Sequence, residues 1–238
     1  MENKNTAQSV TERLIADSAD LFEEFYAHPF VTGMGDGTLD HAKFQYYMIQ
    51  DYLYLIDYAK VFAVGAAKAD DLDIMRVFAS SLHATVDGEM ELHRGYMRRL
   101  GISGEEAENT PMHPANRSYT SYMLRIAYEG GAAEVTAAIL SCAVSYKMIG
   151  EKLLEKYPHA AEDSFFGEWI RSYTSREYRE ETQMLAEQMN RLAADLPESG
   201  IRKLSSIFRI CSEYERGFWD MGWQGAPVSA VPFGETSL

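Results

Sequence analysis

Apolar residues recur at intervals of three and four along most of this chain, which is the spacing of an amphipathic helix. The longest such stretch runs from about Asp40 to Lys68, and further ones follow to about residue 223. Almost no stretch shows the alternation with period two that a half-buried strand requires. Roughly 70% of the residues fit a helical pattern, well above the one-third of an average protein, so the pattern predicts an all-α helical bundle.

Glycine and proline clusters divide the periodic stretches. We expect a turn at residues 33–37, Thr38 as the cap of the next helix, Gly101 as the end of the third, and a loop at Thr110–Pro114. No linker or repeat is evident, so we expect residues 1–238 to form a single domain. Within it, residues 225–238 are expected to be a loosely packed tail. The expected helices span about 7–27, 40–68, 71–100, 115–129, 132–156, 160–173, 175–195 and 198–223.

Charge and cysteine content narrow the classes of function. Lys and Arg number 22 against 36 Asp and Glu, and the resulting net charge of -14 disfavours binding to nucleic-acid phosphates. The two cysteines form no CxxC motif, and the polar first residues contain no apolar signal core. No run of 18 uncharged apolar residues is present. We therefore expect a cytoplasmic protein with reduced cysteines that binds neither membranes nor nucleic acid.

Cys142 is the first candidate for chemistry. It lies in the apolar run Ala138–Tyr146, one helical turn before Tyr146, so that a thiol and a phenol share one helix face. A thiol placed in this way can act as a nucleophile with the phenol as its partner. The plainer interpretation is a structural cysteine, because free cysteine is among the most buried residue types.

Two carboxyl groups share helix faces with aromatic residues. A buried Asp51 would need hydrogen bonds or a ligand, whereas the alternative is a solvated face with Asp51 outermost. Glu215 aligns with Phe218 in the last helix, and its alternative is a surface salt bridge. Asp51 stands in a row of tyrosines at spacings of four, three and four, namely Tyr47, Tyr54 and Tyr58.

The third helix carries two further pairs of ionisable residues. His83 and Asp87 are four residues apart, as are Glu89 and His93, so each pair is expected to form on one helix face. A di-metal site in a helical bundle would use a Glu-x-x-His motif from each of two helices. Met90 stands where that glutamate would be, and no second copy exists, so the spacing does not favour a metal site.

Several stretches distributed over the chain match one known pattern. They are His28–Val31 with Gly33–Leu39, Phe44–Leu55, Ala59–Val61, Glu89–His93, Ser118–Met123, Leu140–Cys142 with Tyr146, Gly150–Leu154, Tyr214–Glu215 and Phe218–Trp219. Together they resemble the TenA family, the thiaminase II or aminopyrimidine aminohydrolase proteins, over nearly the whole length. Any one stretch alone would be weak, whereas the combination is specific.

This resemblance implies a fold like that of haem oxygenase but without haem, no cofactor, and assembly as a homotetramer. It places Cys142 at the family's nucleophile, Glu215 at its acid/base, and Asp51 at the carboxylate that holds the amino edge of the pyrimidine. The chain departs from the family locally at Ala143–Ser145 and at Arg216–Gly217, which affects the shape of the pocket. The positions that line the ring or stack on it correspond to Tyr54, Tyr119, Tyr146, Tyr173 and Phe218.

The implied activity is a hydrolase reaction of thiamin salvage. It releases 4-amino-5-hydroxymethyl-2-methylpyrimidine from the corresponding aminomethyl-pyrimidine, from thiamin, or from both. A Cys142 thiolate would add to an electrophilic ring carbon, while Glu215, with a pKa raised by burial, would supply and reclaim a proton. Two alternatives stay open: a pyrimidine-binding regulatory protein with little turnover, and a relative that uses a metal or oxygen on the same fold.

Overall fold

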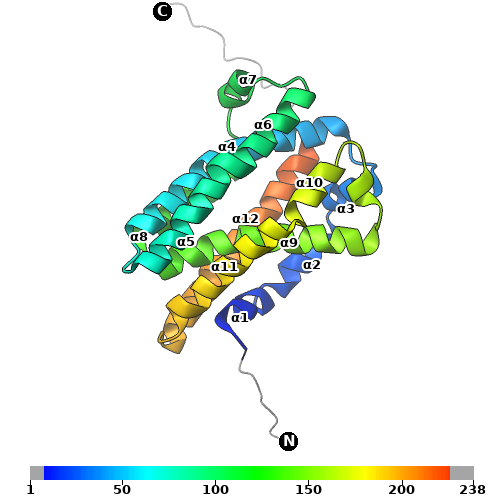
Figure 1. The fold of residues 1–238 in the computed structure, drawn as a ribbon. Coiled ribbons are helices and arrows are strands. Elements are labelled where there is room, and N and C mark those ends of the chain that lie inside the picture. The colour runs from blue at the N-terminus through cyan, green and yellow to red at the C-terminus, as the bar shows by residue number, and fades with distance from the viewer. Residues whose placement is uncertain (1–7, 226–238) are drawn as a thin grey trace, which may run out of the picture.

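The computed structural model describes residues 8–225, and within them every regular element is helical, which confirms the all-α prediction (Figure 1). The expected tail, apart from Gly225, lies outside the described residues. The elements are α1 (Val10–Ala16), α2 (Ala19–Ala27), α3 (Pro29–Asp36), α4 (His41–Ala67), α5 (Leu72–His83), η1 (Ala84–Glu89), α6 (Met90–Arg99), α7 (Gly104–Asn109), α8 (Pro114–Glu129), α9 (Ala132–Lys156), η2 (Ala160–Glu162), α10 (Gly167–Tyr173), α11 (Arg176–Ala193) and α12 (Glu198–Gln224).

The glycine-rich residues 33–37 are mostly helical, so the turn expected there is wrong except at its end. Pro29 occupies the first turn of α3, where its missing N–H is not needed. The helix ends at Gly37, whose φ of 76° is readily adopted only without a Cβ. The expected cap Thr38 is also wrong, because the Asp40 side chain accepts the Ala42 N–H and so caps α4.

The expected third helix contains an interruption that the spacing did not indicate. Between α5 and α6 the chain forms η1, a π-helical segment in which the Met90 N–H donates to the Thr85 carbonyl, five residues back. Such segments are frequent at functional sites. The end of α6 follows the prediction: Gly101 has a φ of 75°, and the Ile102 N–H donates to the Met97 carbonyl over 2.8 Å.

Three other boundaries differ from the expected ones. The first helix divides into α1 and α2, and α7 fills part of the region before the Thr110–Pro114 loop. The helix expected at 160–173 divides into η2 and α10. One Asp163 oxygen accepts the N–H groups of Phe165 and Phe166, and this local turn competes with a continuous helix.

The core is centred on α9, which packs against α4, α8, α11 and α12 and crosses the bundle in Figure 1. By length and composition α9 could span a membrane, but 78% of its most apolar window is buried within the protein. It is therefore the central helix of this core. Its neighbour α4 turns the predicted tyrosine row inward, so that Tyr47, Asp51, Tyr54 and Tyr58 are all buried.

Candidate active site

A cavity lies where α4, η1, α9, α10 and α11 meet. In this structure it encloses about 20 Å³, which is room for roughly one water, so a heterocyclic ring requires side chains to move. An adjoining outer pocket of about 250 Å³ is mostly apolar. The residues that line both spaces, and therefore form the wall between them, are Glu89, Tyr173, Tyr178 and Glu181.

One side of the cavity holds a connected hydrogen-bond network around Asp51, which is 3% exposed. His93 Nε2 lies 2.7 Å from Asp51 Oδ2, and the Tyr47 hydroxyl donates to the same oxygen over 3.1 Å. The hydroxyl groups of Tyr47 and Tyr146 are also 3.1 Å apart, and Trp169 Nε1 donates to Tyr47 over 3.3 Å. The carboxylate is thus buried with several donors rather than solvated.

The thiol lines the same cavity, and the second carboxyl group lies close to the thiol. Cys142 lines the cavity from α9, and burial raises the pKa of its thiol well above the ordinary value, with the Glu215 charge adding to the effect. Glu215 is 1% exposed, and the Tyr119 hydroxyl donates to its Oε1 over 2.7 Å. Burial raises the pKa of Glu215 to about 8, although hydrogen bonding from Tyr119 opposes this shift.

The residues singled out in the sequence converge from five helices, α4, α8, α9, α10 and α12. The side chains that line the cavity itself are Asp51, Tyr54, Cys142, Tyr146 and Tyr173. Glu215, Tyr119 and Phe218 do not line the cavity. The rings of Phe218 and Tyr119 both pack against Tyr54, with centroids 5.6 Å and 5.3 Å from that of Tyr54.

Sequence reasoning missed several residues of the site. Tyr178 and Glu181 were not selected, and Glu89 was considered only as a partner of His93. The segment η1 and the packing of α11 bring these residues to the cavity. Burial raises the pKa of Glu89 to about 8, and that of Glu181 to about 7. Tyr47 was visible in the tyrosine row, but its hydrogen bond to Asp51 follows only from its orientation.

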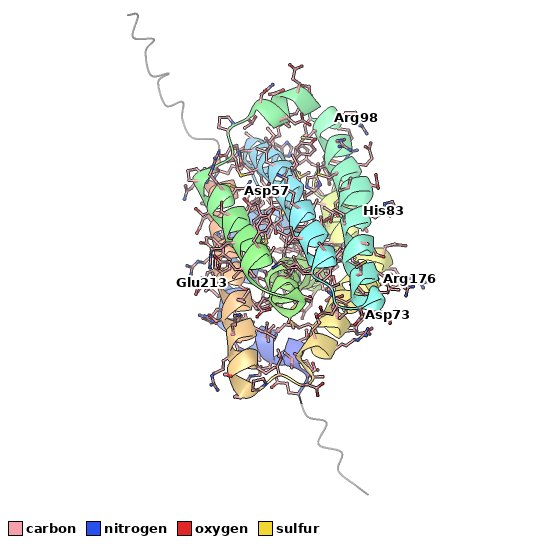
Figure 2. All side chains as sticks on the ribbon, turned by 90° about the vertical axis from the view of Figure 1, so that its left-hand side faces the viewer. Asp57, Asp73, His83, Arg98, Arg176 and Glu213 are labelled. Carbon is pink, nitrogen blue, oxygen red and sulfur yellow. The ribbon has the colours of Figure 1, made fainter. Side chains whose placement is uncertain are left out.

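The two ionisable pairs of the third helix have opposite outcomes. His83 and Asp87 form the expected pair, 2.6 Å apart, and His83 is 77% exposed at the periphery of the bundle (Figure 2). The expected side-chain pair of Glu89 and His93 is wrong, since His93 Nε2 contacts Asp51 and Nδ1 contacts the backbone carbonyl of Glu89. Among residues 8–225, no three His, Cys, Asp or Glu side chains group closely enough to hold a metal ion.

Residues 16–225 match the model of the TENA/THI-4/PQQC family, which covers almost all of the described chain. The chain belongs to this family. A relative named aminopyrimidine aminohydrolase, from Halalkalibacterium halodurans, is 44% identical over 215 residues, covering 90% of this chain and 96% of that relative. The resemblance seen in the sequence is therefore confirmed.

Solved structures of similar proteins agree with this family fold. A TenA homologue from P. horikoshii superposes with a TM-score of 0.83 at 30% identity, and covers 92% of this chain and 100% of its own. A domain with a haem-oxygenase-like fold from Shewanella denitrificans has a TM-score of 0.73 at 14% identity, over 89% of this chain and 91% of its own. The second likeness concerns the fold alone, and it confirms the expected haem-oxygenase-like architecture.

Proposed function

We propose that this protein is an aminopyrimidine aminohydrolase of thiamin salvage. It would release 4-amino-5-hydroxymethyl-2-methylpyrimidine from an aminomethyl-pyrimidine, from thiamin, or from both. The observation on which the proposal rests is the convergence of a thiol and a carboxylate, Cys142 and Asp51, on one buried cavity with Glu215 beside the thiol. The 44% identity to a relative named for this activity supports the same assignment.

Cys142 and Glu215 divide the chemistry between them. Because burial keeps Cys142 a thiol and Glu215 a carboxylic acid at neutral pH, the resting pair carries no charge. Glu215 would give its proton to a ring nitrogen while it accepts the proton of the thiol, and sulfur would bond to an electrophilic ring carbon. This exchange creates the nucleophile only when the ring is in place, so a resting thiolate is not required.

Expulsion of the amine and addition of water complete the reaction. The electron-rich ring would push out the amine, which takes the proton of the ring nitrogen through Glu215 as it leaves, and an exocyclic methylene would remain. Water then adds its hydroxyl to that carbon, and its proton returns through Glu215 as the carbon–sulfur bond breaks. The sum is one water consumed and one amine released, with Cys142 and Glu215 restored.

The outer pocket offers a place for the leaving group. The ring would occupy the enlarged inner cavity, with the amino edge against Asp51, so its substituent points toward the wall formed by Glu89, Tyr173, Tyr178 and Glu181. Ammonia needs little of this space, whereas a thiazolium ring would use it. Release rates measured for the aminomethyl-pyrimidine, its formylated form and thiamin would show how far the pocket favours each one.

The test of the function is Cys142→Ser. We expect ammonia or thiazole release to fall on the order of 10⁴-fold, because a serine hydroxyl at this site is a far weaker nucleophile. Cys211→Ser is the matched control, since Cys211 is also a buried free cysteine but lines neither pocket described above, and it should keep near-normal turnover. Undiminished release by Cys142→Ser would refute the covalent mechanism.

The regulatory alternative is separated by the wild-type protein itself. Tight pyrimidine binding by calorimetry without product by chromatography would favour a binding protein over an enzyme. The close approach of Glu215 to the thiol favours turnover, because a site for binding alone needs no acid beside a nucleophile.

We further propose a homotetramer in the cytoplasm. Exposed apolar side chains on α5 and α11, which include Leu72, Met75 and Met184, support a subunit contact on this side of the bundle. Light scattering of the purified protein measures the assembly directly. A monomer at micromolar concentration would contradict this part of the proposal.

A further inference from the structure

His93 has a contact pattern that restricts where its protons can be. Its Nδ1 lies 2.8 Å from the backbone carbonyl oxygen of Glu89, and a carbonyl can only accept a hydrogen bond. Nδ1 must therefore carry a proton. The π-helical segment η1 ends at Glu89, so the irregular backbone lies at the point that holds the imidazole.

The second ring nitrogen then determines the charge of the pair. Nε2 lies 2.7 Å from Asp51 Oδ2, so one proton must lie between these two atoms. It belongs either to an imidazolium facing a carboxylate or to a carboxylic acid facing a neutral ring. In both cases His93 and Asp51 together hold one proton more than a neutral histidine and an ionised aspartate.

The surroundings of Asp51 favour the ion pair. Oδ2 also accepts the Tyr47 hydroxyl, and two donors on one oxygen stabilise a carboxylate. Burial lowers the pKa of His93, but the hydrogen bond and the charge of Asp51 outweigh it, so that the pKa is raised. Within residues 8–225 no hydrogen bond uses Oδ1 of Asp51, which leaves this oxygen for a ligand in the cavity that Asp51 lines.

We propose that His93 is a positioning residue, an imidazolium fixed by the Glu89 carbonyl that keeps Asp51 ionised and its free oxygen available for the amino edge of the substrate. This inference rests on the proposed function. The ionised oxygen calls for an N–H donor at the 4-position of the ring, which the 4-amino group of the proposed substrates provides and a 4-oxo group does not. A 4-oxo analogue should therefore bind poorly.

Other ionisable groups face this pair from the elements packed around it. Among these groups, the tyrosine hydroxyls and the cysteine thiol are neutral at pH 7. Burial raises the pKa values of the three carboxyl groups to between about 7 and about 8. The ionisable groups around the pair are Tyr47 on α4, Glu89 on η1, Cys142 and Tyr146 on α9, Tyr173 on α10, Glu181 on α11 and Glu215 on α12. At neutral pH, His93 is the one cation in this set.

The variant His93→Gln separates charge from hydrogen bonding. Its amide can still donate to Asp51 but cannot carry a positive charge, so the hydrogen bond is kept while the charge–charge attraction is lost. We expect the acidic limb of kcat/KM to move up by about 1 pH unit or more, with KM raised at pH 6 and recovering toward pH 8.5. His83→Gln, which removes an exposed histidine paired with Asp87, should leave the profile unchanged.

A uniform loss of activity at every pH in His93→Gln would indicate a merely structural histidine and would overturn the proposal. Nitrogen NMR of the imidazole provides a second measurement that needs no turnover. In the wild type both ring nitrogens of His93 should be protonated at pH 7, whereas in Asp51→Asn the Nε2 atom should lose its proton. A bare ring nitrogen in the wild type at pH 7 would contradict the ion pair, even if His93→Gln failed to fold.

These measurements distinguish the two proposals. If the wild type releases no product but both His93 nitrogens are protonated, the proposed function fails and the ion pair stands. If the wild type is active and His93→Gln has an unchanged pH profile, the role of His93 fails and the function stands.

Discussion

The two carboxyl groups beside the cavity are almost equally buried but have different neighbours. Asp51 has a histidine and a tyrosine hydroxyl on one oxygen. Glu215 has the Tyr119 hydroxyl and no cation among the groups that shift its pKa, which burial raises to about 8. The difference teaches that the partner, more than depth, decides whether a buried carboxyl group is a fixed charge or a proton donor.

Of the variants that test the difference between Asp51 and Glu215, we expect Glu215→Gln to have the largest effect on catalysis. The amide keeps the shape of the side chain but cannot exchange a proton, so kcat should fall about 10²–10⁴-fold while substrate binding is mostly retained. Glu213→Gln is the matched control, because Glu213 is on the same helix and points away from the packed interior (Figure 2). Steady-state kinetics measure both. Similar losses in the two variants would mean that Glu215 has no special role.

Asp51→Asn should act mainly on binding. The amide removes the charge that attracts the substrate's amino edge, and loss of a hydrogen bond to a charged group corresponds to about 1.5–3 kcal/mol, or about 10–150-fold in kcat/KM. The loss should appear largely as a higher KM. Asp57→Asn on the same helix is the control, since Asp57 is half-buried, pairs with Lys60 and lines neither pocket. A normal KM in Asp51→Asn would remove Asp51 from substrate recognition.

Sequence alone predicted much of this site, for identifiable reasons. The tyrosine row around Asp51 and the spacing of Cys142 and Tyr146 are properties of single helices, which periodicity describes. The partners of Asp51 could not be obtained in this way. His93 was assigned to Glu89 because the two are four residues apart, but η1 rotates the helix face, and the imidazole reaches α4 instead.

Contacts that helical periodicity does not describe also explain the helix boundary that was predicted wrongly and the residues of the cavity wall that were missed. Asp163 divides one expected helix through hydrogen bonds to Phe165 and Phe166, and a local turn of this kind has no periodic signature. Glu89 and Glu181 come from elements far apart in sequence and meet only through tertiary packing. Burial determines the pKa values of these two residues. The sequence does not reveal this burial, because charged residues in a helical pattern predict an exposed position.

Tyr119→Phe tests the Glu215 side more gently. The hydroxyl of Tyr119 lowers the pKa of Glu215, so its removal should raise that pKa further and extend activity to higher pH. In the wild type the acid is lost as pH rises through about 8, and the alkaline limb of kcat/KM should lie there.

The rate near pH 7 should fall about tenfold in Tyr119→Phe, as expected for loss of one buried hydrogen bond. Tyr122→Phe, one helical turn away and half-buried, is the control. An alkaline limb that moves to lower pH in Tyr119→Phe would contradict the assignment of that limb to Glu215.

The smallest expected effect concerns stability rather than rate, and it extends the comparison to the wall of the cavity. Burial raises the pKa of Glu181 to about 7, from 4.5 in an ordinary environment. Between these values the folded protein binds more protons than the unfolded chain, so the free energy of unfolding falls as pH rises from about 4.5 to about 7.

Glu181→Gln removes this pH-dependent contribution to the free energy of unfolding. Its Tm should exceed that of the wild type by about 2–4 °C at pH 8, for a gain of about 1 kcal/mol, and the difference should shrink toward pH 5. Glu177→Gln, exposed on the same helix, should show no such pH dependence in thermal denaturation. If the Tm difference for Glu181→Gln is the same at pH 5 and pH 8, the carboxyl group is solvated in solution, and burial without a cation does not set its charge.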